Sequence, residues 1–162
     1  MNAFAVAILA YVTLERLAEL FLANTNTKRL LAKGAREHGA SHYPLIVAVH
    51  ALWLATLWVL ASGREPDMFW LAIYVFLQAA RLWVLATLGP RWTTRIIVLP
   101  GDDLVKEGPY RFLNHPNYWV VAGEIAVLPL VFGLPWVALI FTILNAAVLA
   151  VRVREENRAL RR

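Results

Sequence analysis

The chain is built from five apolar stretches separated by shorter polar segments. A helix needs about 20 apolar residues to cross the hydrocarbon of a membrane, and most of the stretches approach that length. Polar residues rarely interrupt these stretches, and the third one is interrupted only by Gln78 and Arg81. The pattern predicts an all-α integral membrane protein with about five transmembrane helices, of which the fourth is short. The five stretches are residues 3–23, 43–61, 67–88, 118–132 and 134–151.

The polar segments between these stretches contain the turn and loop signals. Residues 62–66 and 133–135 combine glycine and proline as in tight turns, so the last two stretches are expected to form a helical hairpin. The longest polar segment, residues 89–116, has three Gly/Pro breaks, and residues 93–99 between them suit a short extended piece. The charged tail after Val151 is expected to continue the last helix. A chain of this length forms one domain by default.

Composition agrees with a membrane environment. Hydrophobic residues make up 60% and charged residues 17% of the 162 residues, against roughly 45–50% and 25% in an ordinary soluble domain. The chain has no cysteine, which excludes disulfides, thiolate nucleophiles and cysteine-ligated metals. A net charge of +5 would suit nucleic-acid binding in a soluble protein. In a membrane protein it more often reflects basic residues on the cytoplasmic side, and the positions of these residues distinguish the two interpretations.

The basic residues follow the predicted membrane topology. On the five-helix pattern, thirteen Lys and Arg residues fall in the first loop, the third loop and the C-terminal tail, whereas the second loop has one, Arg64. Lys and Arg favour the cytoplasmic side of a membrane. This distribution predicts an N-terminus outside and a C-terminus in the cytoplasm. It also explains the net charge without a nucleic-acid partner.

Several polar residues lie inside the apolar stretches at a similar depth, on the order of 10 Å from the cytoplasmic ends of their helices. Charged groups inside a membrane are expensive and usually face the protein interior. Two interpretations are open: a structural network in which Arg81 pairs with Glu15 or Glu124, or a cavity that accepts a polar ligand. His50 alone fits a satisfied core histidine better than a catalyst. The layer consists of Glu15, His50, Gln78, Arg81, Glu124 and Asn145.

Residues 104–118, at the start of the fourth helix, hold the richest set of chemically useful side chains. Pro116 suits the first helical position, where exposed backbone N–H groups are able to bind a carboxylate. His115 is suited to donate a hydrogen bond to a carboxylate or ribose, and Tyr110 and Tyr118 to stack on an adenine ring. The same residues would equally serve as an anchor at the level of the lipid headgroups. Spacing alone leaves both interpretations open.

The run Gly-Pro-Tyr-Arg-Phe-Leu-Asn-His-Pro-Asn-Tyr resembles the signature of the isoprenylcysteine carboxyl methyltransferase family. In that signature, Gly-x-Tyr-Arg is followed by His-Pro-x-Tyr and, after the last helix, by a Glu-Glu pair. The resemblance covers roughly residues 78–160, and Asn114 stands where the family usually has Arg. The matching residues are Gly108, Tyr110, Arg111, His115, Pro116, Tyr118, Arg154, Glu155 and Glu156.

The resemblance implies a membrane-embedded methyltransferase with a cytoplasm-facing pocket for S-adenosylmethionine between its last helices. Residues 1–88 would form a three-helix N-terminal part, and residues 89–162 the cofactor-binding part of the same domain. Arg154 and Glu156 would lie nearest the reacting oxygen of the substrate, as catalytic residues. The cofactor would be held by Tyr110, Arg111, His115, Pro116, Asn117 and Tyr118, together with Glu155 or Glu156.

The N-terminal half resembles a bacterial branch of this family that is similar to alkylpyrone and alkylresorcinol O-methyltransferases. Residues 15–20, 39–44 and 91–95 carry this likeness. The branch implies a bacterial inner-membrane protein, surrounded by membrane lipid, whose substrate is a lipophilic small molecule. A phenolic or pyrone lipid and a prenylated carboxylate are both compatible with it. The polar layer would adjoin this substrate, and no oligomeric state is predicted.

Methyl transfer to oxygen needs two positioned substrates and a desolvated nucleophile rather than a metal. A carboxylate is already a nucleophile, whereas a phenol with a pKa near 10 needs a base, for which Glu156 and His115 are candidates. A lipid tail is expected to pass sideways between helices, where small residues let backbones approach or leave a gap. These small residues are Ala79, Ala80, Ala122 and Gly123. The alternative function is a non-enzymatic membrane scaffold or a small transporter with a buried polar network.

Overall fold

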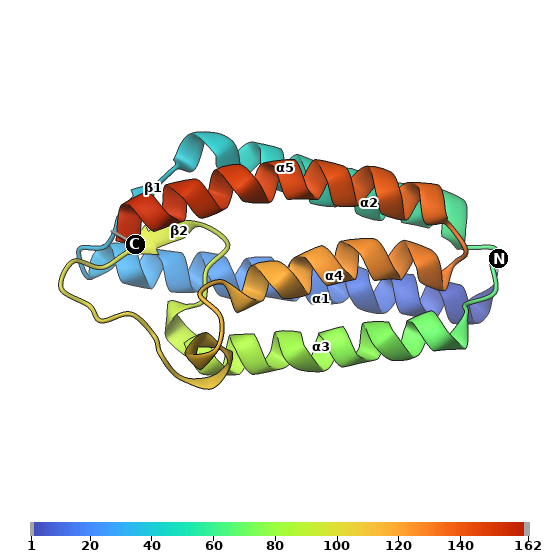
Figure 1. Cartoon of the computed structure of the whole chain (residues 1–162), viewed down its shortest axis with the longest axis horizontal. Coiled ribbons are helices and arrows are strands. Elements are labelled where there is room, and N and C mark those ends of the chain that lie inside the picture. The colour runs from blue at the N-terminus through green and yellow to red at the C-terminus, as the bar shows by residue number, and fades with distance from the viewer. Residues whose placement is uncertain (1, 161–162) are drawn as a thin grey trace.

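The computed structural model describes residues 2–160, which form five long helices running side by side (Figure 1). Two short strands lie in the loops at one end of this bundle, which we call the sheet end; the N-terminus lies at the opposite end (Figure 1). The helices are α1 (Ala3–Ala32), α2 (Tyr43–Ala61), α3 (Met68–Leu88), α4 (Pro116–Val131) and α5 (Pro135–Leu160). The strands are β1 (Arg36–His38) and β2 (Ile96–Val98), and the 3₁₀ turns are η1 (Ala40–His42), η2 (Gly89–Arg91) and η3 (Gly108–Arg111).

Capping residues explain where several helices begin. The side-chain oxygen of Asn2 accepts two backbone N–H groups of the first turn of α1, at 2.9 and 3.2 Å, and Asp67 caps α3 in the same way. Both α4 and α5 begin at a proline, whose fixed φ suits the first helical position. Between them, Gly133 adopts a φ of 64°, which a side chain would disfavour. The helical hairpin expected at this turn is therefore confirmed.

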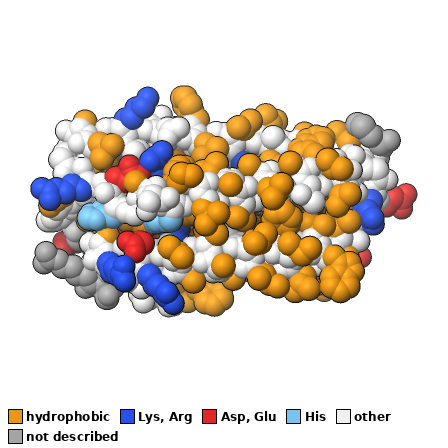
Figure 2. All heavy atoms as spheres, turned by 90° about the horizontal axis from the view of Figure 1, so that it is seen from above, with side chains coloured by type: hydrophobic (Ala, Val, Ile, Leu, Met, Phe, Trp, Pro, Cys, Tyr) orange, Lys and Arg blue, Asp and Glu red, His pale blue; other side chains and the backbone are white. Residues whose placement is uncertain are grey.

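Within residues 2–160, three segments are long and apolar enough to cross a membrane, namely Ala40–Ala61, Met68–Arg91 and Pro135–Leu160. α1 is long enough, but Glu15, Arg16 and Glu19 interrupt its apolar sequence, and α4 has 16 residues. Figure 2 shows apolar side chains over the middle of the bundle, with Lys and Arg gathered mainly at the sheet end. The mostly helical membrane architecture is confirmed at this level, and five crossings remain a prediction.

The first helix is longer than expected: α1 continues to Ala32 rather than ending near residue 23. Its last turns are held because the amide of Asn26 donates to the backbone oxygen of Trp92, at 2.8 Å, in the loop before β2. The extended piece expected within residues 93–99 is confirmed as β2. This strand pairs antiparallel with β1, with Arg36 opposite Val98.

The two loops at the sheet end are joined by Arg95. Its guanidinium lies 2.7 Å from the carboxylate of Glu37 and 4.3 Å from the centre of the Tyr43 ring. The hydrogen bond to Glu37 raises the pKa of Arg95 above its ordinary value, so the cation persists at any physiological pH. The loop between α1 and α2 is thereby tied to the loop between α3 and α4.

Helices α3 and α4 pack closely against each other and leave no gap between them. A Cβ atom added to Gly123 would lie 3.0 Å from the side chain of Leu77, so glycine is what permits the approach. Here the small residue brings two helices together rather than leaving a gap. The half of the bundle away from the sheet end is filled by a core that includes Leu9, Trp53 and Leu128.

Candidate active site

A buried group of charged residues joins α1, α3 and α4 inside the bundle. Arg81 donates from Nε and Nη2 to the two oxygens of Glu19, and its Nη1 lies 2.8 Å from Glu124. Arg16 reaches the same two carboxylates, at 3.1 Å and 2.8 Å. We call these four residues the ion cluster. Gln78 adds a hydrogen bond of 3.3 Å to Glu124, which is 1% exposed.

The ion cluster agrees in part with the polar layer expected from the sequence. Arg81 pairs with Glu124, one of the two partners that the sequence left open, whereas Glu15 lies 3.9 Å from Arg16. Sequence reasoning missed Glu19, the other partner of Arg81. The available signal was its spacing, because Glu19 follows Glu15 by one helical turn and shares its face.

A second network joins the start of α4 to the end of α5. The hydroxyl of Tyr118 donates to Glu156 and accepts from Nε of Arg152 at 2.8 Å. Arg152 also lies over the Tyr118 ring, 5.4 Å from its centre. Residues four apart are neighbours on one helix face, so α5 presents a cation and an anion to the same phenol. We call Tyr118, Arg152 and Glu156 the tyrosine network.

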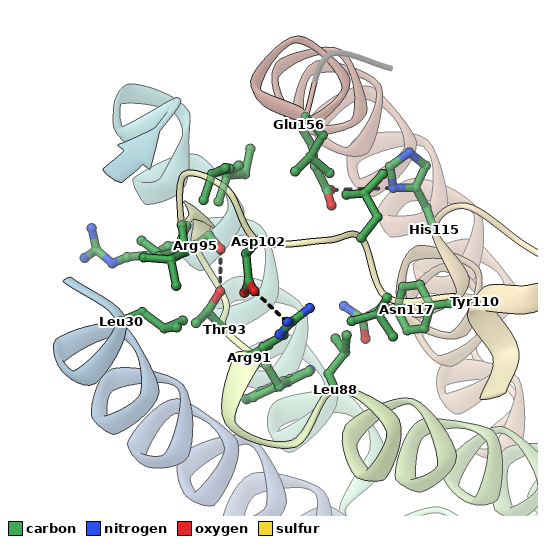
Figure 3. Close-up of a pocket in the computed structure, with 18 of the residues that line it drawn as sticks. Leu30, Leu88, Arg91, Thr93, Arg95, Asp102, Tyr110, His115, Asn117 and Glu156 are labelled. Atoms are coloured by element: carbon green, nitrogen blue, oxygen red, sulfur yellow. Dashed lines mark hydrogen bonds and ion pairs between the residues drawn. The ribbon is translucent and has the colours of Figure 1, made fainter. Parts of the chain in front are cut away.

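His115 extends the tyrosine network toward the end of α5. Its ring stacks on that of Tyr118, with centroids 5.3 Å apart and planes inclined by 14°. Its Nε2 atom lies 3.0 Å from the side-chain oxygen of Asn157. Its Nδ1 atom lies 3.6 Å from Glu156, and Figure 3 shows these two side chains facing each other. The imidazole is therefore fixed both in its plane and across its face.

A cavity of about 180 Å³ opens beside the tyrosine network at the sheet end (Figure 3). It is bounded by the loop around β2, the start of α4 and the last turns of α5. Charged groups of both signs line it, including Arg91, which binds Asp102 at 2.9 Å. We call it the polar cavity. Its polar wall includes Arg91, Asp102, Tyr110, His115, Asn117 and Glu156.

A second cavity, of about 280 Å³, lies among α1, α2, α4 and α5. Its wall is mostly apolar, and we call it the apolar cavity. Charged members of the ion cluster and His50 complete this wall on one side. The aliphatic residues are Leu17, Leu20, Ile46, Val47, Ala51, Leu54, Val121 and Leu149.

The two cavities meet at five residues that line both of them. This shared wall consists of Trp92, Thr93, Asn117, Tyr118 and Arg152. The indole N–H of Trp92 and the side-chain oxygen of Asn117 are buried there without a hydrogen-bond partner in the described part of the chain. A buried polar atom without a partner costs roughly 1–3 kcal/mol. A ligand that reaches these atoms would therefore recover part of that free energy.

Comparison with known sequences decides the family. The sequence model of the isoprenylcysteine carboxyl methyltransferase (ICMT) family matches residues 70–162, which include the tyrosine network. The chain belongs to the ICMT family. It is 40% identical over 158 residues to the uncharacterized protein YpbQ of Bacillus subtilis (strain 168), covering 94% of each chain. An uncharacterized protein of Haemophilus influenzae is 26% identical over 151 residues, covering 90% of this chain and 88% of that one. No solved structure matches the chain.

The family resemblance expected from the motifs is thus confirmed. ICMT proteins are methyltransferases, and together with the three apolar segments this membership identifies an integral membrane protein. Within residues 2–160, no group of three or more His, Asp and Glu side chains is arranged to hold a metal ion.

The structure brings five of the nine residues predicted to bind the cofactor or to be catalytic to the polar cavity, namely Tyr110, His115, Asn117, Tyr118 and Glu156. Pro116 is buried and begins α4. Two others line neither cavity: Arg111 is exposed beside Phe112, and Glu155 forms an ion pair of 2.9 Å with Arg158. Their roles in cofactor binding stay predictions.

Arg154, expected to be catalytic, is exposed and lines neither cavity, whereas Arg152 lines both. Helix geometry explains the difference. Each residue turns the chain by about 100°, so Arg154 points away from the face that Arg152 and Glu156 share. The spacing of four residues back from Glu156 was the signal that could have identified Arg152.

Proposed function

We propose that this ICMT-family protein is a membrane-embedded O-methyltransferase with S-adenosylmethionine as methyl donor and a lipid as acceptor. The observation that carries this proposal is the pair of cavities of opposite chemistry that meet at the shared wall. A polar donor on one side and a lipid on the other would meet beside Tyr118 and Arg152. Family membership favours methyl transfer over a scaffold or a transporter.

The polar cavity suits S-adenosylmethionine by its charges and hydrogen-bonding groups. That cofactor carries a sulfonium, an ammonium and a carboxylate. Glu156 offers an anion for the ammonium, Arg91 a cation for the carboxylate, and Tyr110 an aromatic ring for the adenine. The unpartnered oxygen of Asn117 offers a further acceptor. When bound, the cofactor supplies an electrophilic methyl group.

The apolar cavity suits a lipid acceptor that arrives from the bilayer. Leu17, Leu20 and Val47 line this cavity and are also 58%, 38% and 41% exposed. They belong to α1 and α2, so an apolar path leads from the surface of the bundle between these two helices. The close contact of Gly123 with Leu77 argues against a path between α3 and α4.

Positioning of the acceptor oxygen is the task we assign to the tyrosine network. Arg152 offers guanidinium N–H groups at the shared wall, and the hydroxyl of Tyr118, which itself donates to Glu156, holds the Nε atom of that guanidinium in place. A carboxylate acceptor would yield a methyl ester and a hydroxyl acceptor a methyl ether. The apolar wall excludes water, which would otherwise solvate the nucleophile and slow its attack.

We further propose that all five helices cross a bacterial inner membrane, with the polar cavity open to the cytoplasm. The start of α1 and the end of α5 lie at opposite ends of the bundle (Figure 1), which supports an odd number of crossings. The basic residues near the sheet end support its cytoplasmic location. These residues include Lys28, Arg29, Lys33, Arg36, Arg91 and Arg95.

Replacing Arg152 by methionine is expected to lower kcat/KM by roughly 10–100-fold, because a charge-assisted hydrogen bond is worth roughly 1.5–3 kcal/mol. Transfer of a labelled methyl group from S-adenosylmethionine to pentadecylphenol, or to a prenylcysteine, in detergent micelles measures the effect. Arg154→Met is the matched control, and it should change the rate by no more than about twofold as a surface substitution. Equal losses in both variants would contradict the assignment, and no turnover by the wild type on either acceptor would contradict the proposed function.

A further inference from the structure

Among the described residues, one titratable side chain that lines the apolar cavity keeps an unused lone pair able to accept a proton. Arginine side chains only donate. Both oxygens of Glu19 already accept guanidinium N–H groups, and the hydroxyls of Tyr43 and Tyr118 are already hydrogen-bonded. That leaves His50. The titratable residues that line this cavity within the described chain are Arg16, Glu19, Tyr43, His50, Arg81, Tyr118 and Arg152.

The hydrogen bonding of His50 fixes which ring nitrogen is basic. Its Nδ1 atom lies 2.8 Å from the backbone oxygen of Ile46, one turn earlier in α2. A carbonyl oxygen only accepts, so Nδ1 carries the proton in the neutral ring and Nε2 carries the lone pair. Nε2 has no hydrogen bond to any described residue. The ring that lines the cavity is therefore held in the tautomer that a general base needs.

The bases expected from the sequence line the other cavity. Glu156 and His115 line the polar cavity and not the apolar one. Glu156 already accepts from Tyr118, and the Nε2 atom of His115 is engaged with Asn157. A proton released on the lipid side thus has His50 as its acceptor in the same cavity.

The chemistry of the acceptor decides whether a base is needed in the apolar cavity. The charged side chains that line it are Arg16, Arg81, Arg152 and Glu19. A lipid carboxylate is already ionised and would need only a cation beside it. A lipid hydroxyl must lose a proton as it is methylated, and the free Nε2 atom of His50 suits that acceptor.

We propose that His50 is the general base that takes the proton from a lipid hydroxyl in the apolar cavity. The proposal rests on the methyltransferase function proposed above. As the hydroxyl oxygen bonds to the methyl carbon, the carbon–sulfur bond breaks and its electron pair moves to sulfur. The O–H proton moves to Nε2 of His50, and the imidazolium releases it to water after the ether leaves. The products are a methyl ether, S-adenosylhomocysteine and a proton.

A pair of acceptors of different acidity tests this role in the full-length protein. Pentadecylphenol keeps its proton at neutral pH, since phenols have a pKa of about 10. A derivative with two nitro groups conjugated with the hydroxyl is already ionised at that pH and needs no base. His50→Gln is expected to lower kcat on pentadecylphenol by about 10²-fold, at the lower end for general-base catalysis. The same variant should keep most of its kcat on the nitro derivative.

Two controls separate this role from a structural one. His42→Gln removes a histidine that lines neither cavity and should leave both rates unchanged. Binding of S-adenosylhomocysteine should be equal in the wild type and His50→Gln, which shows that the fold and the cofactor site persist. An equal loss on both phenols, or no loss on either, would overturn the role of His50. A wild type that binds S-adenosylhomocysteine but methylates neither phenol would overturn it too, whereas a wild type that does not bind it would refute the proposed function itself.

Discussion

Replacement of Arg81 by leucine is expected to destabilise the protein by about 3–5 kcal/mol, the usual cost of breaking a buried ion pair. Arg81 donates to both oxygens of Glu19 and lies 2.8 Å from Glu124, and the side chains of these partners are 8% and 2% exposed. Without Arg81, Arg16 alone faces both carboxylates. Thermal unfolding of the purified protein in detergent micelles measures the loss of stability.

Two further variants test whether the expected loss of stability comes from the burial of the charges. Arg158→Leu removes an arginine whose side chain is 76% exposed, and its ion pair with Glu155 should contribute at most about 1 kcal/mol. Arg81→Leu combined with Glu19→Gln should recover part of the stability, because it removes one of the uncompensated carboxylates. An Arg81→Leu protein as stable as Arg158→Leu would show that the ion cluster does not hold the bundle together.

Replacement of Glu156 by glutamine is expected to lower methyl transfer by about 10³-fold, the upper range for removing one preorganised electrostatic contact. Glu156 accepts from Tyr118 and lies 3.6 Å from His115, so its loss frees two residues of the polar cavity at once. It also removes the anion assigned to the ammonium of the cofactor. The assay is the same transfer of a labelled methyl group, with the KM for S-adenosylmethionine measured alongside kcat.

The neighbouring residue provides the matched control for this substitution. Glu155→Gln makes the same chemical change one position earlier, where the carboxylate pairs with the exposed Arg158 and lines neither cavity. It should change kcat and KM by no more than about twofold. If Glu155→Gln inactivates the protein and Glu156→Gln does not, the face of α5 assigned to the site is wrong.

The helices could be predicted because each depends on a local signal. The five apolar stretches, the turn at Gly133 and the charged continuation of the last helix are all visible in the order of residues. The end of α1 was harder to predict. Its extension to Ala32 depends on the hydrogen bond from Asn26 to the backbone of Trp92. That partner lies 66 residues further along the chain, so the local sequence pattern does not indicate it.

In the candidate site too, the residues of a local motif could be predicted from the sequence, and those that depend on helix packing could not. His115, Asn117 and Tyr118 could be assigned to a cavity because one short motif places them at one helix start. Choosing Arg152 over Arg154 needed the rotation of α5, which the motif alone does not give. The shared wall forms because Trp92, from the loop before β2, lines the same cavities as residues of α4 and α5. The apolar cavity forms where residues of α1 and α2 line the same space as residues of α4 and α5. Such contacts follow from the packing of whole helices.

Binding of S-adenosylhomocysteine to the detergent-purified protein tests the central claim most directly. Calorimetry of the wild type should give micromolar affinity, and His115→Ala should abolish it without lowering the unfolding temperature. His115 lines the polar cavity and stacks on Tyr118, so its removal should affect binding. It lies outside the ion cluster, so its removal should leave the stability of the bundle unchanged. A folded wild type that binds no S-adenosylhomocysteine would contradict the account, and so would equal affinity in the wild type and His115→Ala.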